Sequence, residues 1–220
     1  SLNTSTLPSG ATFVNNGNGT GTFNWTPTFT QSGAYNIRFF ASDGVLLDTE
    51  LVIITVIEAG NQRPVLAVIG AKTVTEGVNL AFGISATNAD GPVPVLTTSA
   101  LPAGATFINN LNGTGNFSWT PTFIQSGVFN VTFYARDDSL AVDSQRVAIT
   151  VLDAGNQAPV LAIINAKSVT EGIALSFNVS AVDADGTTPN MTTSTRPAGA
   201  NFVNNGNGTG TSTWTPTFTQ

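Results

Sequence analysis

The acidic side chains are few and lie at a small number of positions, so they are the first candidates for chemistry. The chain has 13 Asp and Glu among 220 residues. Glu76 follows a predicted first strand, Asp153 ends a predicted last strand, and Asp183 and Asp185 lie in a turn after a strand with alternating apolar residues. In a two-sheet domain, the end of a last strand meets the turns of the following domain. We therefore expect these four carboxylates to face one another across the linker 154–159.

Carboxylates that converge on a junction repel one another unless a hard cation lies among them. Carboxylate, amide and carbonyl oxygens are the ligands that Ca²⁺ prefers, and Asn156 and Gln157 of the linker supply the last two kinds. The alternative is that these are solvated loop acids, which is the usual situation of Asp in turns. The candidate calcium ligands are Glu76, Asp153, Asn156, Asp183 and Asp185.

Enzyme chemistry has little support in the composition. The chain has no His and no Cys, which excludes Ser-His-Asp and Cys-His sites, disulfides and thiolate metal sites. Paired carboxylates can hydrolyse glycosides only where a cleft raises the pKa of one of them, and the acids lie at strand ends without an evident apolar pocket. We therefore predict a protein that is not an enzyme and has no cofactor other than candidate Ca²⁺.

The charge balance excludes further classes of partner. Seven Lys and Arg against 13 acids give a net charge of −6, whereas nucleic-acid binding requires clustered basic residues. Anionic membrane surfaces are disfavoured for the same reason. No apolar run approaches the roughly 18 residues of a membrane-spanning helix.

One phrase occurs three times and sets the organisation of the chain. Its copies are residues 7–31, 101–125 and 196–220, and the second and third match the first at 19 and 20 of 25 positions. Their tryptophans, Trp25, Trp119 and Trp214, lie 94 and then 95 residues apart. This period is that of a whole small domain. The sequence predicts a complete repeat over 61–155, the later part of a repeat over 1–60, and the earlier part of a repeat over 156–220, as in a window cut from a longer array.

Sequence patterns typical of β-strands occur throughout each repeat. Apolar residues alternate over 78–86, and again over 128–135 and 146–151, with Phe129, Val131, Phe133, Val147 and Ile149 among the inward-facing residues. Asn112-Gly113 predicts a type I′ hairpin turn. The change of spacing from 94 to 95 places one extra residue in the loop 137–142 relative to 43–47. About seven short strands with turns every 8–12 residues predict a β-sandwich.

The aromatic residues allow two interpretations. The repeated tryptophan shares a strand face with Phe117 in the complete repeat, which favours a place in the core over a platform for sugar stacking. Tyr35 lies where a tyrosine corner is expected, but Phe129 replaces it in the next repeat, so the hydroxyl is not essential. Phe40 and Tyr134 occupy predicted outward positions of the late strand.

Several short motifs, taken in order, resemble a known class of repeat. VTEG, DADG, LPAGATF, QSGVFNVTFYARDD and DAGNQAPV are similar to the dystroglycan-type cadherin-like and Ig-like repeats of large bacterial surface proteins. The resemblance covers essentially all of each repeat. It implies an all-β fold of tandem Ig-like (cadherin-like) sandwiches and calcium between repeats. The calcium-ligand positions of that pattern are matched by Glu76 and Glu171, by the Asp183-Ala-Asp185 turn, and by Asp153 with Asn156. Gly155 and Gln157 depart from the linker pattern, and Glu58 and Asn88 replace Asp at the earlier junction.

The sequence thus favours a non-enzymatic extracellular array at the bacterial cell surface that serves as a stalk, adhesin or fibre subunit. Its expected partners are neighbouring repeats, copies of itself, and cell-surface glycans or proteins. The alternative is a carbohydrate-binding accessory region of a secreted hydrolase, which requires exposed aromatics on one face.

Overall fold

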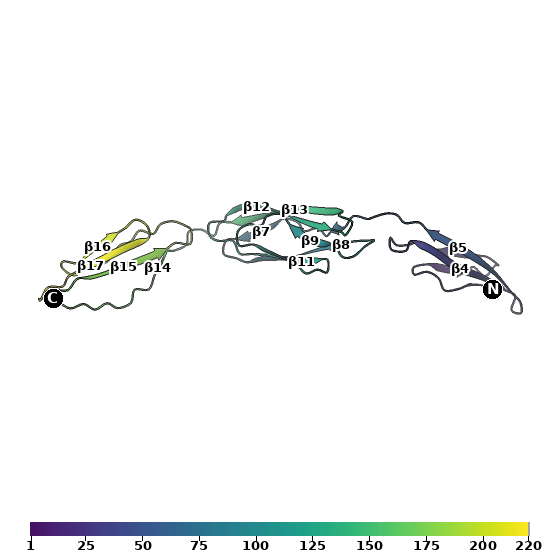
Figure 1. The fold of residues 1–220 in the computed structure, drawn as a ribbon, viewed down its shortest axis with the longest axis horizontal. Coiled ribbons are helices and arrows are strands. Elements are labelled where there is room, and N and C mark those ends of the chain that lie inside the picture. The colour runs from purple at the N-terminus through teal and green to yellow at the C-terminus, as the bar shows by residue number, and fades with distance from the viewer. Residues whose placement is uncertain (220) are drawn as a thin grey trace.

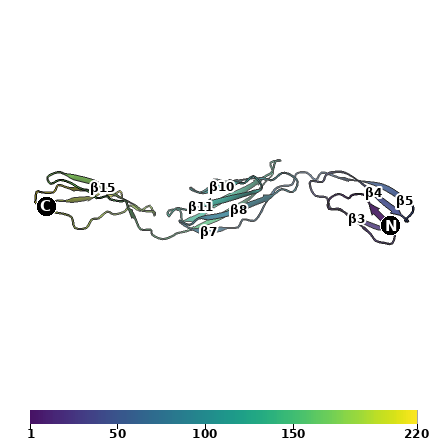
Figure 2. The same ribbon diagram turned by 90° about the horizontal axis from the view of Figure 1, so that it is seen from below.

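The computed structural model describes residues 1–219, which form three bodies arranged along one long axis (Figure 1). The view turned by 90° shows the same extended arrangement (Figure 2). The described residues contain β-strands and no α-helix, which confirms the predicted all-β class.

The middle body is a complete sandwich of two four-stranded sheets. One sheet has the order β10-β11-β8-β6 and the other β7-β13-β12-β9. Neighbouring strands pair antiparallel, except that β7 pairs parallel with β13. The eight strands are β6 (Val65–Leu66), β7 (Lys72–Thr75), β8 (Leu80–Thr87), β9 (Val95–Thr98), β10 (Thr106–Asn109), β11 (Thr114–Trp119), β12 (Gly127–Arg136) and β13 (Val142–Leu152).

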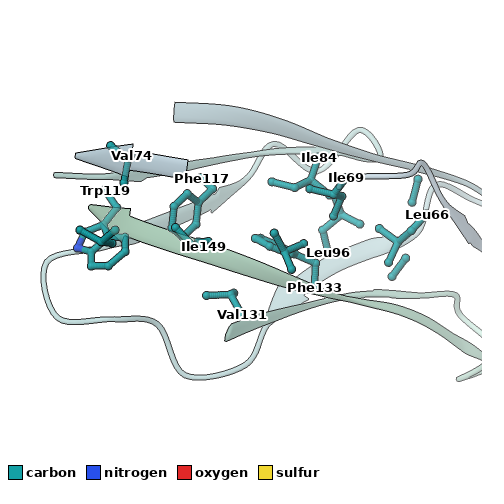
Figure 3. Packing of buried hydrophobic residues seen from close by; sticks show 14 residues of the cluster. Leu66, Ile69, Val74, Ile84, Leu96, Phe117, Trp119, Val131, Phe133 and Ile149 are labelled. Atoms are coloured by element: carbon teal, nitrogen blue, oxygen red, sulfur yellow. The ribbon is translucent and has the colours of Figure 1, made fainter. Parts of the chain in front are cut away.

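The core of this sandwich follows from the alternation of apolar residues along its strands, since successive side chains point to opposite faces of a sheet. Trp119 and Phe117 on β11 are each 1% exposed, and they face Phe133 and Ile149 of the opposite sheet (Figure 3). Phe117 and Phe133 meet edge to face with their ring centroids 6.1 Å apart. Burial of one such aromatic side chain contributes about 4 kcal/mol as an upper bound. The predicted core position of the tryptophan is confirmed.

The alternating strand begins later than the pattern predicts. It starts at Leu80 instead of Val78, whose amide closes a turn on the Thr75 carbonyl at 3.1 Å. Val78 is therefore exposed. The predicted inward faces of β12 and β13 are correct, because Val131, Phe133, Val147 and Ile149 are all buried.

The hairpin between β10 and β11 has a different turn from the one predicted. A type I′ turn needs positive φ at both central residues, but here Leu111 (φ 62°) and Gly113 (φ 78°) have positive φ and Asn112 does not. The side-chain oxygen of Asn112 instead accepts hydrogen bonds from the amide and hydroxyl of Thr114, at 3.1 and 2.7 Å. Local side-chain bonding has thus replaced the predicted two-residue turn with a four-residue loop.

The late hairpin carries the extra residue where the change of spacing predicted it. Strands β12 and β13 are joined by residues 137–141, and β4 and β5 by residues 43–46. Both hairpins keep their inward faces, because the insertion lies in the loop and leaves the strand registers unchanged.

The first body contains the later strands of the repeat. A sheet of order β1-β4-β5 faces a separate hairpin, β2-β3, which is joined to it by no strand pairing. Phe39 on β4 packs against Phe13 and Phe23 of the hairpin. The strands are β1 (Leu2–Thr4), β2 (Thr12–Asn15), β3 (Gly21–Asn24), β4 (Gly33–Ser42) and β5 (Leu47–Val56).

The third body contains the earlier strands. They form a single sheet of order β14-β15-β17-β16, with no second sheet opposite it among the described residues. The strands are β14 (Val160–Leu161), β15 (Leu175–Val182), β16 (Asn201–Asn204) and β17 (Thr209–Trp214). Residues 167–170, which correspond to β7, form no strand.

Candidate functional site at the repeat junctions

Glu76 anchors the linker that leaves the middle sandwich. It follows β7 and is 3% exposed, and its Oε2 accepts a hydrogen bond from the Ala154 amide at 3.2 Å. Its own amide donates to the Leu152 carbonyl at 3.0 Å. Its Oε1 is buried without a hydrogen-bond partner. The side chain therefore ties the end of β7 to the start of the linker that follows β13.

Asp185 holds the same linker from the other side, and Asp183 supports the turn that carries Asp185. Asp185 Oδ2 accepts a short hydrogen bond from the Gln157 amide. Asp183 accepts from the Thr187 hydroxyl at 2.7 Å and from the Asp185 amide at 3.0 Å. These two bonds lower the pKa of Asp183 below its usual value because they stabilise the carboxylate. The bond from the Thr187 hydroxyl has the larger effect and the bond from the Asp185 amide the smaller.

Asp153 and Asn156 lie exposed in the linker and bond only locally. Asp153 Oδ1 accepts from the Gly155 amide at 2.7 Å, and Asn156 Nδ2 donates to the Gln157 carbonyl at 3.2 Å. The structure thus brings Glu76 and Asp185 to the two ends of one linker. Within residues 1–219, no three His, Cys, Asp or Glu side chains are grouped so that they could hold a metal ion.

The first junction repeats this arrangement with further contacts. Asp90 Oδ2 accepts a short hydrogen bond from the Gln62 amide, as Asp185 does from Gln157. Asp137 is 5% exposed and accepts from Asn61 Nδ2 at 2.9 Å and from the Ala141 amide at 2.7 Å. Sequence analysis did not select Asp90 or Asp137, whose partners are the linker residues Gln62 and Asn61.

Two oxygen atoms at the first junction have no partner. Asn88 Oδ1 and Asp90 Oδ1 are both buried and accept no hydrogen bond. Asn88 Nδ2 is directed to the Pro92 carbonyl at 3.4 Å. Buried acceptors without donors are costly, and Glu76 Oε1 at the second junction is in the same situation.

The linker glutamines complete a motif shared by the two junctions. Gln62 Nε2 donates to the Gly60 carbonyl and Gln157 Nε2 to the Gly155 carbonyl, both at 2.9 Å. We call the pairing of linker Gln and turn Asp the junction clamp; it consists of Gln62 with Asp90 and Gln157 with Asp185. Because the two clamps have the same bonds, the chain enters the second and third bodies in the same way.

The aromatic residues do not form an exposed row. Trp119 is buried and its Nε1 donates to the Ala103 carbonyl at 3.1 Å, and Phe40 and Tyr134 are half-buried. Tyr35 donates its hydroxyl to the Gln31 carbonyl at 3.0 Å, which is the bond of a tyrosine corner. Residues 1–219 include no helix that could span a bilayer.

Comparison with known families supports the fold. Residues 63–152 match the family described as "Putative Ig domain", and these residues form the complete sandwich. The middle body is therefore an Ig-like domain.

Among curated proteins, chitinase A of Pseudoalteromonas piscicida is 26% identical over 155 residues. The alignment covers 70% of this chain and 19% of the chitinase, so the chain spans only a small part of the length of that relative.

Among solved structures, the endo-fucoidan hydrolase MfFcnA4 of glycoside hydrolase family 107 is 21% identical, covers 100% of this chain and 35% of its own, and has a TM-score of 0.42. A mutant of the SrpA adhesin of Streptococcus sanguinis is 13% identical over 61% of this chain and 94% of its own, with a TM-score of 0.38. Similarities at this level do not identify a function.

Proposed function

We propose that this chain is part of a non-enzymatic, extracellular array of Ig-like repeats at the bacterial cell surface, where it serves as a stalk, adhesin or fibre subunit. The observation that carries the proposal is the junction clamp. Gln62 with Asp90 and Gln157 with Asp185 fix the entry of two successive repeats by the same bonds. Each clamp holds the linker against the repeat that follows it, so the chain enters successive repeats at the same position and length grows with repeat number.

The middle repeat supports a mechanical role. Its core is closed by its own two sheets, and its buried titratable side chains, Glu76 and Asp137, each bond the backbone of a linker or loop. Acids used in this way position the chain and do not face a substrate cleft. The proposed function therefore depends on the shape and length of the array.

The junction clamp gives a direct test of this role. Asp90→Ala together with Asp185→Ala removes both acceptors, and we expect a broader distribution of distances between the first and third bodies by double electron–electron resonance. Glu171→Ala removes an exposed acid away from both junctions and is the matched control. A compact particle for the unaltered chain in small-angle X-ray scattering contradicts the stalk, and so does equal broadening in both variants.

Calcium at the junctions is the second part of the proposal. Asn88 and Asp90 each carry a buried oxygen that lacks a donor, and a hard cation is a partner that such an oxygen can bind. At the second junction, the proposed ligands are Asp153, Asn156, Asp183 and Asp185, with Glu76 of the preceding repeat. A bound ion would reduce the remaining freedom of the linker.

The melting temperature tests this part separately. A ligand that binds only the folded state raises stability, so Ca²⁺ is expected to raise the melting temperature relative to a chelator. Asn88→Ala removes one of the unpaired oxygens and is expected to reduce that difference. Equal melting temperatures with Ca²⁺ and with chelator would contradict calcium binding but would not affect the proposed role as a stalk.

The second candidate function is a carbohydrate-binding accessory region of a secreted hydrolase. It is favoured by the similarity of 155 residues to part of chitinase A. Tyr134 on the outward face of β12 is the aromatic residue that would contact a sugar ring. Binding to insoluble chitin that is lost in Tyr134→Ala and retained in Thr132→Ala supports this function; no binding by the unaltered chain excludes it for this ligand.

A further inference from the structure

The outward face of the sheet β7-β13-β12-β9 carries two arginines. Arg136 lies on β12 and Arg146 on β13, and both side chains are exposed. Their strand neighbours Ala135 and Val147 are buried, so the arginines point away from the core. The one acid in these four strands, Asp143, lies on the inward side, opposite Ala135. This face is therefore positive although the chain has a net charge of −6.

Tyr134 lies between the two arginines on the same face. It is two residues before Arg136 on β12, and the strand register places it opposite Thr97 of β9 and Ser144 of β13. Arg146 is two residues beyond Ser144, on the side of Tyr134 away from Arg136. Because a strand rises about 3.3 Å per residue, the two arginines are about 13 Å apart along the strand direction, with the tyrosine midway.

The polar groups of this face have no partner within the described chain. The face, which we call the arginine face, consists of Thr97, Tyr134, Arg136, Ser144 and Arg146. Among residues 1–219, no hydrogen bond or ion pair engages the guanidinium or hydroxyl group of any of them. The tyrosine is half-buried and the other four side chains are exposed. These donors are therefore available to a ligand outside the chain.

The first body has a similar arrangement on its equivalent strands. Phe40 on β4 corresponds to Tyr134, and it also lies between two polar residues, Asn3 of β1 and Thr49 of β5. Arg38, two residues earlier on the same face, is exposed. An aromatic ring beside an arginine thus occurs at the same place on two successive repeats. A polymeric ligand can engage both, which raises its overall affinity.

The arginine beside the ring changes strand between the two repeats but keeps its place. Arg38 pairs across the sheet with Leu51 in the first body. The equivalent pair of the middle sandwich is Thr132 with Arg146. One member of this cross-strand pair is an arginine in both repeats, so the positive charge beside the aromatic ring is present in both although different residues carry it.

Each part of the arginine face can bind one feature of an acidic sugar chain. An aromatic ring offers a flat apolar surface for the C–H face of a sugar, and the tyrosine keeps a polar hydroxyl at its rim. The hydroxyls of Thr97 and Ser144 can exchange hydrogen bonds with sugar hydroxyls. The planar fork of an arginine binds a carboxylate or a sulfate through two parallel hydrogen bonds.

The number and spacing of the charges disfavour denser polyanions. Duplex DNA carries about one charge per 1.7 Å and is bound by many clustered basic residues. The arginine face has only two arginines, about 13 Å apart along the strand direction. The net charge of −6 opposes a dense polyanion further. A sugar chain with an acidic group on every second sugar has the wider spacing of charges that two separated arginines can meet.

We propose that the arginine face binds a linear polysaccharide that carries widely spaced carboxylate or sulfate groups. The inference rests on the cell-surface role proposed above and names the class of its glycan partner. Tyr134 contacts a sugar in the middle of the bound segment. Arg136 and Arg146 hold acidic groups on either side of it.

Soluble polysaccharides test the role of charge and distinguish the two acidic groups. Hyaluronate carries a carboxylate and κ-carrageenan a sulfate on every second sugar, whereas dextran is uncharged. In isothermal titration calorimetry with the full chain at physiological ionic strength, we expect binding of at least one charged polymer and none of dextran. Binding of only one of the two identifies the acidic group. Binding of neither, or equal binding of dextran or of duplex DNA, overturns the proposal.

Removal of the two arginines tests the face itself. Arg136→Gln with Arg146→Gln is expected to weaken binding of the charged polymer about tenfold or more, because it removes two charge-assisted contacts. Arg63→Gln with Arg196→Gln is the matched control, since it changes the net charge equally at two exposed positions outside the face. Equal weakening in the two variants would mean that only net charge matters, and it overturns the proposal.

A gain of affinity is expected from Thr97→Lys, which keeps the test valid if the loss variants misfold. The new cation lies opposite Tyr134 on the edge strand β9 and is expected to tighten binding about threefold. Ala81→Lys adds the same charge at an exposed position of β8, on the opposite sheet, and is the control. Unchanged affinity in Thr97→Lys, or an equal gain in both variants, contradicts the proposed site.

The failure of this inference is distinguishable from the failure of the proposed function. A chain that is extended in small-angle X-ray scattering but binds neither charged polymer overturns the glycan partner alone. A compact particle overturns the stalk. Binding of chitin without binding of either charged polymer overturns this inference and favours the second candidate function.

Discussion

The middle and third bodies contain nearly the same sequence in different surroundings. Trp119 and Trp214 both donate to the carbonyl of the residue 16 positions earlier, at 3.1 and 3.2 Å. Trp119 is almost fully buried, and Trp214 is only half-buried. The hairpin of the repeated phrase therefore forms with its own hydrogen bonds in either case. The opposite sheet decides how much apolar surface is removed from water, and with it the stability of the domain.

The largest difference is expected at the tryptophan. Trp119→Ala should cost about 4 kcal/mol, because it removes a fully buried ring, and Trp214→Ala about 2 kcal/mol. Hydrogen–deuterium exchange of the β8–β11 and β15–β17 ladders measures each loss in its own repeat. Equal losses would mean that the opposite sheet contributes little to the core.

The next difference is expected at the first acid of the late loop. Asp137 is buried and bonded to Asn61 and Ala141, whereas its equivalent Asp43 is exposed and bonded only to the amides of Val45 and Leu46. Asp137→Ala should cost about 2 kcal/mol, since it removes a buried carboxylate that accepts two hydrogen bonds. Asp43→Ala should cost less in the same denaturation experiment, and a reversed order would contradict the role of Asp137 in holding the linker.

A small gain is expected in the hairpin loop. Leu111 has a φ of 62°, and the first and third copies have Gly17 and Gly206 at this position, with φ of 77° and 74°. Because a left-handed conformation is strained for Leu, Leu111→Gly should stabilise the middle repeat by about 0.5 kcal/mol after the entropy cost of glycine. Gly206→Leu is the converse variant and should destabilise the third body. A gain of stability in both variants would mean that backbone strain is not the cause.

The smallest effect concerns the charge of Asp183. Its pKa is lowered by the Thr187 hydroxyl and the Asp185 amide, so the contribution of this carboxylate to stability is present above its unfolded pKa and is lost as pH falls through the lower folded value. Thr187→Val should raise the pKa toward that of an ordinary Asp in an NMR titration of the carboxyl carbons. Asn88, with no carboxylate, lies at this position of the earlier junction, so the effect should be confined to the third body.

The sequence predicted the sandwich and much of its core because alternation of apolar residues specifies which face of a strand is buried. It placed the extra residue in the late hairpin loop, since the inward faces on both sides keep their period. The turn at Asn112 was wrong, because the bonds of its own side chain to Thr114 compete with the turn type that Asn-Gly favours. The candidate ligands were placed near the junctions, but which oxygen meets which amide depends on how two loops and a linker approach one another.

The amino-acid sequence by itself determined the repeat, its strand faces and the absence of His and Cys chemistry, because these follow from local pattern and composition. Only the tertiary structure decided that Asp90 and Asp185 hold the linkers and that Asn88 and Asp90 keep unpaired oxygens. The physical reason is that burial and hydrogen bonding between distant segments depend on what lies opposite each face. The alternation of apolar residues is set by the sequence of each strand, but the burial of those residues depends on the opposite sheet.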